Sequence, residues 1–160
     1  ADNPQLLGAA QRAWLADTLQ QSTAQINILV SGTQIISEEH RYEKWANFPT
    51  DRAWLLKLIR EESIPGVICI SGDRHIHEIS VLQEADAPYP LVDITSSGLT
   101  HSWTNFKSEP NRHRVGEVFK GLAFGTLTID WDSQPVTITA EIRDGSNQVV
   151  NSTRVELATD

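Results

Sequence analysis

The hydrophobic residues of the chain follow two spacings, one typical of helices and one typical of strands. Apolar residues recur at helical spacing over 7–19 and again over 54–59. Largely apolar runs at 26–30 and 67–70 are typical of strands buried on both faces. Helix, strand, helix, strand is the pattern of an α/β crossover unit. On the same spacing, we place Trp14 in the core.

The last quarter of the chain has a different pattern. Over 124–160, apolar and polar residues alternate in three runs separated by turn residues, which predicts a three-stranded antiparallel β-meander with one buried face. The part before it, 83–123, contains a short strand at 91–94 and loops, after a break at 85–88. We therefore expect one α/β domain with an α+β edge, whose first part, 1–82, has the order αβαβ.

Length and charge narrow the range of functions. The chain has 160 residues, which is enough for one domain with a substantial core. Its formal net charge of −8 argues against a nucleic-acid-binding surface, because such surfaces are basic. No apolar run approaches the roughly 18 residues that a membrane span needs. The single Cys69 lies within a predicted buried strand, so we assign it to packing.

The most informative stretch follows the strand at 67–70. The strand ends at Ser71-Gly72, and a run of polar side chains follows at once. On an extended chain, alternate residues of this run would point to one face. Carboxylates and imidazoles together suit a divalent or trivalent metal ion. A histidine pair at a strand end is also found on ordinary protein surfaces, so both interpretations stay open. The residues are Asp73, Arg74, His75, His77 and Glu78.

Two other strand ends carry candidate chemistry. The strand at 26–30 also ends in Ser-Gly, at Ser31-Gly32, which suggests that the two strands are neighbours whose ends line one cleft. The strand at 91–94 is followed by hydroxyl residues and a glycine at 95–98. These could bind phosphate oxygens or simply build a turn.

The segment 71–75, Ser-Gly-Asp-Arg-His after an apolar strand, resembles the last metal-binding motif of the alkaline-phosphatase-D-like (PhoD-like) metallophosphatases. These belong to the calcineurin-like phosphoesterases. Further similarities occur in the same order along the chain, at 7–15, 45–52, 93–101 and 124–131. The resemblance implies half of a four-layer αββα sandwich and metal-dependent hydrolysis of phosphate esters.

The resemblance also implies roles for individual residues. Asp73 and His75 would be the catalytic metal ligands; Asp73 stands where the family usually has histidine, which shifts the preference toward harder cations. We expect two metal ions, drawn from iron, calcium, manganese and zinc. Arg74 would neutralise phosphate or orient Asp73. The remaining roles implied are hydrogen bonds from His77 and Glu78 that hold the ligands. From its position after the strand at 91–94, His101 is a candidate substrate contact or an ordinary surface histidine.

The sequence departs from the family at several points. None of the family's earlier motifs, Asp-x-His, Gly-Asp-x-x-Asp and Gly-Asn-His-(Asp/Glu), occurs ahead of the strand at 67–70. Gln34 stands where a metal-ligating histidine often follows the earlier strand, and the sequence leaves open whether its amide takes that role. We therefore expect the C-terminal half of a periplasmic or extracellular enzyme, inactive until an N-terminal half completes it, on the same or a separate chain. The alternative is a non-catalytic binding or assembly module that has lost its metals.

Overall fold

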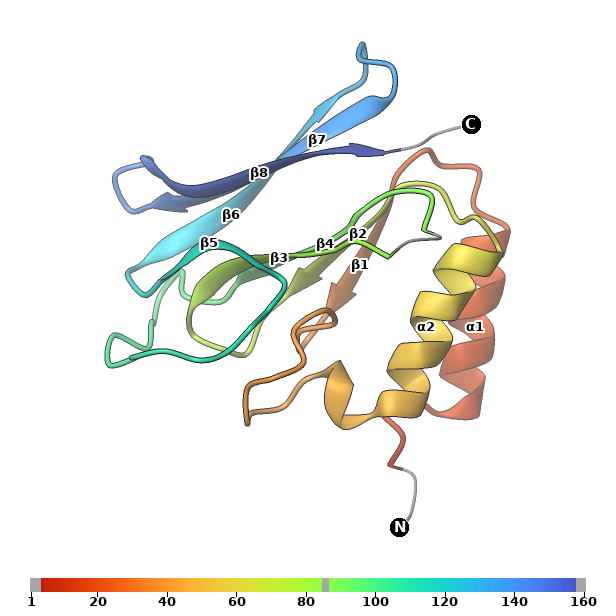
Figure 1. The fold of residues 1–160 in the computed structure, drawn as a ribbon, viewed down its shortest axis with the longest axis horizontal. Coiled ribbons are helices and arrows are strands. Elements are labelled where there is room, and N and C mark those ends of the chain that lie inside the picture. The colour runs from red at the N-terminus through yellow and green to blue at the C-terminus, as the bar shows by residue number, and fades with distance from the viewer. Residues whose placement is uncertain (1–3, 85–86, 158–160) are drawn as a thin grey trace.

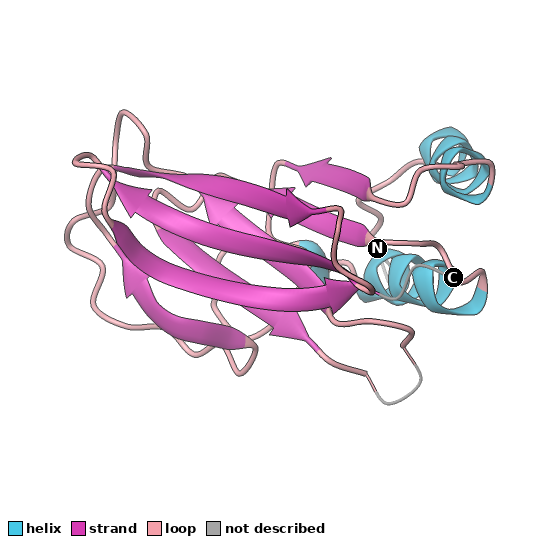
Figure 2. Cartoon of the chain, turned by 90° about the horizontal axis from the view of Figure 1, so that it is seen from above, coloured by secondary structure: helices cyan, strands magenta, loops and turns pink. Residues whose placement is uncertain are grey.

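Two helices and two β-sheets form three layers in the computed structural model, which describes residues 4–84 and 87–157 (Figure 1). The helices α1 (Ala9–Gln20) and α2 (Pro49–Glu61) lie against one face of the larger sheet, and the smaller sheet covers the other face. A 3-10 helix, η1 (Trp45–Asn47), precedes α2. Seen from above, the strands of the two sheets overlie one another (Figure 2).

The larger sheet is mixed and has five strands in the order β1-β2-β4-β3-β5. Its three parallel strands, β1, β2 and β4, end at one edge, and β3 and β5 complete the sheet as antiparallel neighbours. The expected order of helix, strand, helix and strand is present up to β2, and β3 follows within the same part of the chain. The strands are β1 (Asn27–Ser31), β2 (Val67–Ser71), β3 (His77–Leu82), β4 (Leu91–Ser96) and β5 (Arg114–Phe119).

Strand β5 was not anticipated from the sequence, because it lacks a clear alternation of apolar and polar residues. Its pairing with β3 is irregular: His77 lies opposite Phe119, but Ile79 lies opposite Val115. Gly116 has a φ of +64°, a left-handed conformation that glycine adopts without steric cost. The extra residues therefore form a bulge, which bends the edge of the sheet.

The smaller sheet is the expected antiparallel meander, with strands β6 (Ala123–Asp130), β7 (Val136–Asp144) and β8 (Val149–Leu157). Apolar residues of β7 such as Ile138 and Ile142 are buried against the larger sheet. The sheets approach closely where a Cβ built on Gly125 of β6 would lie 3.0 Å from Cδ1 of Ile94 in β4. The end of the expected meander, 158–160, and part of the expected break, 85–86, lie outside the described residues.

The core joins all three layers into one cluster. On the helical side, the buried stripe of α2 contains Leu55, Leu58 and Ile59. It packs toward β2 and β4, whose residues Val67 and Leu91 on the same face are also buried. Burying one such side chain contributes about 1.5–3 kcal/mol, so this contact is the main reason that α2 stays on the sheet.

The placement of Trp14 in the core was wrong, because 62% of its surface is exposed. Its helix, α1, lies beside β1, the last strand on its side of the sheet, so within the described residues nothing covers that part of the helix. The layers described here are helix, sheet and sheet; the second helical layer of a four-layer sandwich remains an expectation. Within residues 4–84 and 87–157, no helix is long and apolar enough to cross a membrane.

Candidate active site

The polar motif lies in a tight turn between β2 and β3, at the edge where the parallel strands end. Ser31 and Ser71 are partners in the β1–β2 register. A Cβ built on Gly72 would lie 3.7 Å from the carbonyl oxygen of Gly32, so the two Ser-Gly ends are close neighbours. This confirms that the strands ending in Ser-Gly lie side by side.

The motif is not extended, so the expectation that Asp73, His75 and His77 leave one face in register was wrong. Asp73 and His75 have φ values of +66° and +52°, in the left-handed region. The turn therefore exposes both side chains and directs Arg74, between them, into the protein. Non-glycine residues in this region carry backbone strain, and such strain is concentrated at functional sites.

Loops that follow β4 hold this turn in place. The backbone amide of His75 donates to Oγ of Ser97 at 3.0 Å, and its carbonyl oxygen accepts from the amide of Trp103 at 2.6 Å. The exposed rings of His75 and His101 meet edge to face, with centroids 5.1 Å apart. The structure therefore brings His101 to the motif. The hydroxyl of Ser97 supports the turn, the structural alternative left open by the sequence.

Asp73 is the side chain of the motif that is available to a ligand. It is exposed and has no hydrogen-bond or ion-pair partner among the described residues. In the same part of the chain, no group of three or more His, Cys, Asp or Glu side chains is arranged to hold a metal ion. Asp73 and His75 are thus two donors that project from one turn, and any further ligands must come from elsewhere.

Arg74 is buried, and its guanidinium group is fully engaged within the protein. It lies 2.9 Å from Nδ1 of His40 and 2.5 Å from Oε2 of Glu109, and it stacks on the ring of Tyr42 with its Cζ 4.6 Å from the centroid. These partners come from two loops, one before η1 and one before β5. Arg74 therefore ties both loops to the turn that carries Asp73.

The position of His40 decides its protonation. Nδ1 of its ring accepts from the amide of Tyr42 at 3.2 Å and faces Arg74, so this nitrogen carries no proton. Burial, followed by the positive charges of Arg74, Lys44 and Arg114, lowers the pKa of His40 to about 3. His40 is therefore neutral, and its Nδ1 accepts a hydrogen bond from the guanidinium group of Arg74.

A buried polar network lies beneath the turn, on the helical face of the sheet. Asp93 of β4 accepts hydrogen bonds from the amides of Ile35 at 2.8 Å and Ile36 at 3.2 Å, and from Oγ of Ser71 at 2.7 Å. Burial raises the pKa of Asp93, although these hydrogen bonds oppose the shift. Asp93 thus anchors the loop after β1 to the strands that carry the motif. The sequence contained a signal for this role, a charged residue inside an apolar strand.

Gln34 and Glu78 belong to the same network. Nε2 of Gln34 donates to Oε1 of Glu78 at 2.6 Å and to Oγ1 of Thr95 at 2.8 Å. Oε2 of Glu78 accepts from Nε of Arg114 at 2.7 Å. Oε1 of Gln34 is buried without a hydrogen-bond partner among the described residues. The structure therefore places both side chains in the interior beneath the turn.

His77 begins strand β3 and is fully buried. Its ring lies next to Gly98, where an added Cβ would come within 2.5 Å of Nε2, and it faces the ring of Phe119 at a centroid distance of 6.3 Å. Burial lowers the pKa of His77. His77 is thus separated from the exposed side of the turn, whereas Asp73, His75 and His101 lie on that side.

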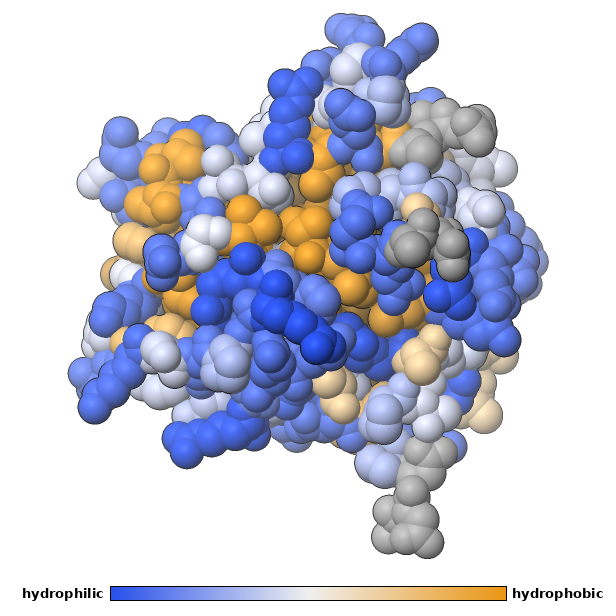
Figure 3. All heavy atoms as spheres, viewed as in Figure 1, coloured by the Kyte–Doolittle hydropathy of each residue, from blue (hydrophilic) through white to orange (hydrophobic). Residues whose placement is uncertain are grey.

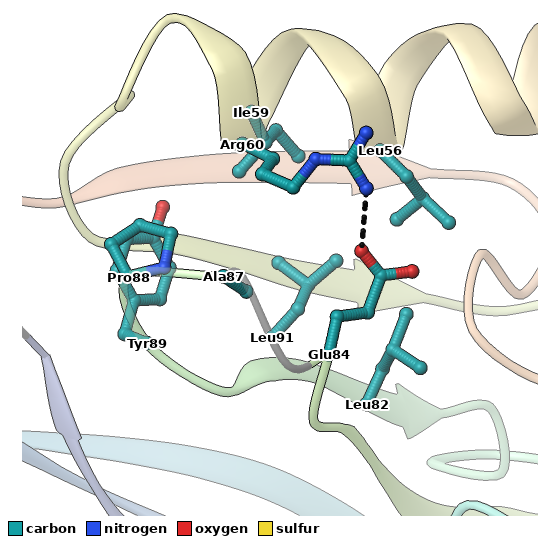
Figure 4. A pocket seen from close by; sticks show the side chains of 9 residues that line it. All are labelled: Leu56, Ile59, Arg60, Leu82, Glu84, Ala87, Pro88, Tyr89 and Leu91. Carbon is teal, nitrogen blue, oxygen red and sulfur yellow. Dashed lines mark hydrogen bonds and ion pairs between the residues drawn. The ribbon is translucent and has the colours of Figure 1, made fainter.

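One hollow can be set aside as a substrate site. It lies between α2 and the ends of β3 and β4, is closed by an ion pair of 3.4 Å between Arg60 and Glu84, and is lined mainly by apolar side chains (Figure 4). Its volume of about 20 Å³ is sufficient for one water molecule. None of the motif residues lines it.

The sequence and the fold have counterparts among known proteins. The model of the PhoD-like phosphatase family matches residues 1–134. The solved structure of PhoD has a TM-score of 0.70 and 15% identity, covering 97% of this chain and 35% of that chain. GAP50, the anchor in the inner membrane complex of Plasmodium, has a TM-score of 0.60 and 15% identity, covering 94% of this chain and 43% of that chain. No curated protein matched the chain.

These matches define first a fold and then a family. The fold is shared with PhoD, and the chain corresponds to about a third of the length of that structure. Since the family model covers most of the sequence, the chain belongs to the PhoD-like phosphatase family. This confirms the resemblance drawn from the motif, including its restriction to part of the family's fold.

Proposed function

We propose that this chain is the C-terminal part of a metal-dependent phosphatase or phosphodiesterase, and that the turn between β2 and β3 is its portion of the active site. The observation that carries the proposal is the turn itself: two strained residues, Asp73 and His75, present a carboxylate and an imidazole outward at the edge where the parallel strands end. Membership of the PhoD-like phosphatase family supports phosphoester hydrolysis.

The donors on this turn fit a metal ion. Within the described residues, Asp73 offers carboxylate oxygens without a competing partner, and the imidazole of His75 meets the ring of His101. Oxygen and imidazole nitrogen together suit iron, manganese or zinc, and oxygen suits calcium. Bound metal ions supply an acidified water nucleophile and positive charge for the phosphoryl oxygens. We propose that two ions bind and that ligands from outside this chain complete their coordination.

The neighbouring residues act through position and charge. Arg74 holds the turn through its contacts with Glu109 and His40. Of its two expected roles, these contacts favour orienting Asp73 over contacting phosphate directly. His101, exposed beside His75, can donate a hydrogen bond to a phosphate oxygen. Glu78 and Gln34 support the site from beneath, through the network that ends at Arg114. His77 contributes by packing at the start of β3.

The proposal requires a partner segment. The chain covers 35% of the PhoD structure, so an N-terminal part of the fold, on the same or a separate chain, would supply the remaining ligands. On its own the chain would be inactive. Export to the periplasm or the cell exterior is part of the proposal by family resemblance alone.

Substitution of the two proposed ligands in the complete enzyme tests the proposal. We expect Asp73→Ala and His75→Ala each to reduce hydrolysis of p-nitrophenyl phosphate or bis-p-nitrophenyl phosphate by at least about a hundredfold, with loss of bound metal measured by elemental analysis. The matched control is Asp132→Ala, which removes an exposed carboxylate from the turn after β6. Unchanged turnover in either ligand variant would end the assignment.

A second function is favoured by one observation. The match to the solved structure of GAP50 covers 94% of the present chain. GAP50 is described as the anchor in the inner membrane complex of Plasmodium. The alternative proposal is that this chain belongs to a non-catalytic assembly module of the same fold. A complete protein that retains its fold but neither binds metal nor hydrolyses either ester would favour this alternative.

A further inference from the structure

On one side of the sandwich, each sheet ends in an edge strand that has a strand neighbour on one side only. These edge strands are β1 and β6. Strand β1 is the outermost strand of the larger sheet there, and β6 is the outermost strand of the smaller one. The main contacts of the smaller sheet are with β3, β4 and β5, and two apolar side chains of β1 are exposed. The inner face of β1 is therefore uncovered by the described residues.

The side chains on this face are apolar. Ile28 and Val30 are partners of Ile68 and Ile70 in the parallel register, so they point toward the inner face of the sandwich. They are nevertheless 49% and 79% exposed. Exposed apolar residues that adjoin one another, unlike scattered ones, mark a surface that normally meets a partner.

The same two residues carry the unpaired backbone groups of the strand. The amide of Asn27 donates to Gly66 on the β2 side at 3.0 Å. Since successive residues of a strand direct their backbone groups to opposite sides, Ile28 and Val30 direct theirs to the free edge. An edge with unpaired N–H and C=O groups and no charged side chains is a template for another strand.

The surroundings extend this surface into α1. An open hollow of about 570 Å³ lies beside the edge, between β1 and α1, and is lined mainly by apolar side chains. The half-buried Leu127 and Ile129 point into the sandwich from β6, the corresponding edge of the smaller sheet. We call the free edge of β1 together with this hollow the β1 edge surface. Its residues include Trp14, Leu15, Ile28, Val30 and Trp45.

We propose that the β1 edge surface binds the part of a PhoD-like fold that lies outside this chain, through a strand that pairs with β1 and apolar side chains that cover Ile28 and Val30. The occupant is identified by length: 97% of this chain is matched within PhoD, but 65% of the PhoD chain has no counterpart here. The inference rests on the proposed function, for which it names the surface that meets the partner segment.

Residue-resolved hydrogen exchange on the complete protein tests the pairing. The amides of Ile28 and Val30 should exchange at least about a hundredfold more slowly than unprotected amides, as paired strand residues do. Exchange at the rate of an unprotected chain would overturn the proposal. The measurement does not depend on catalysis. Protected amides in a protein without activity would support this inference and contradict the proposed function. An active enzyme with unprotected amides would contradict this inference and leave the proposed function unaffected.

A charge substitution tests the apolar contact in the same protein. Val30→Lys should raise the unfolding equilibrium constant at least about tenfold, because it buries a charge against the partner segment. The matched control Val149→Lys, at a valine 45% exposed on β8, should change it less than about threefold. Equal effects of the two substitutions would overturn the proposal. So would a dimer in light scattering that Val30→Lys dissociates, because the occupant would then be a second copy.

Discussion

The buried histidine behind the motif leads to a quantitative prediction of pH dependence. His40 has a pKa of about 3 in the folded protein, against 6.5 for an ordinary histidine. As the pH falls below about 6.5, the unfolded chain binds a proton that the folded protein does not, so the folded state loses stability until the pH approaches about 3. At pH 5.5 the loss from this one group is about 1.4 kcal/mol relative to pH 7.5.

The perturbation that isolates this effect is His40→Asn. An asparagine side chain can place an oxygen near the position of Nδ1 and so still accept from the amide of Tyr42 and from Arg74, but it does not titrate. The variant should therefore lose about 1.4 kcal/mol less than the parent between pH 7.5 and 5.5, whatever its stability at pH 7.5. The other four histidines occur in both proteins, so their contributions cancel in the difference.

Urea unfolding followed by the fluorescence of the five tryptophans measures the two free energies of unfolding at each pH. The matched control is His101→Asn, which alters an exposed imidazole and should leave the pH dependence of the parent nearly unchanged. If the parent and His40→Asn lose the same free energy to within about 0.5 kcal/mol, the reasoning that His40 is a buried neutral acceptor is refuted.

Two further substitutions test how the fold is assembled. Asp51→Ala should destabilise the protein by about 2–4 kcal/mol in urea unfolding, because the buried carboxylate accepts from the amides of Leu6 and Leu7 and pairs with Arg12; a loss below 0.5 kcal/mol would contradict this role. Gly98→Ala should cost about 1–3 kcal/mol, since its Cβ would lie 2.5 Å from the ring of His77. Gly145→Ala, where nothing lies within 4 Å, is the control, and equal effects would argue against close packing at His77.

Elements with a strong local pattern were predictable from the sequence. The helices, the two strands that end in Ser-Gly and the C-terminal meander all follow from hydrophobic spacing. Strand β5 was not predictable, because its irregular pairing with β3 is determined by a neighbouring strand. Trp14 was misplaced for a related reason: helical spacing shows which residues share a face, but it does not show whether that face is covered.

The candidate site was predictable in its exposed residues but not in its support. The residue types of Asp73 and His75 made them candidates, and the structure places both side chains outward on one turn; their role as metal ligands stays a prediction. Their left-handed conformation was not predicted: Asp and His adopt it more often than most residues, but residue type alone does not determine it. Asp93 anchors the amide of Ile35, 58 residues earlier, and contacts over such distances depend on the tertiary fold. The same holds for the enclosure of Arg74 by two separate loops.

The left-handed conformations of Asp73 and His75 have a consequence for evolution in the laboratory. Each costs up to about 1–2 kcal/mol for a residue with a Cβ, and glycine would remove that cost. Selection for thermal tolerance alone should therefore drift toward glycine in this turn and discard the two donor groups. Under the proposed function, selection for turnover should keep both residues and recover the lost stability at distant positions.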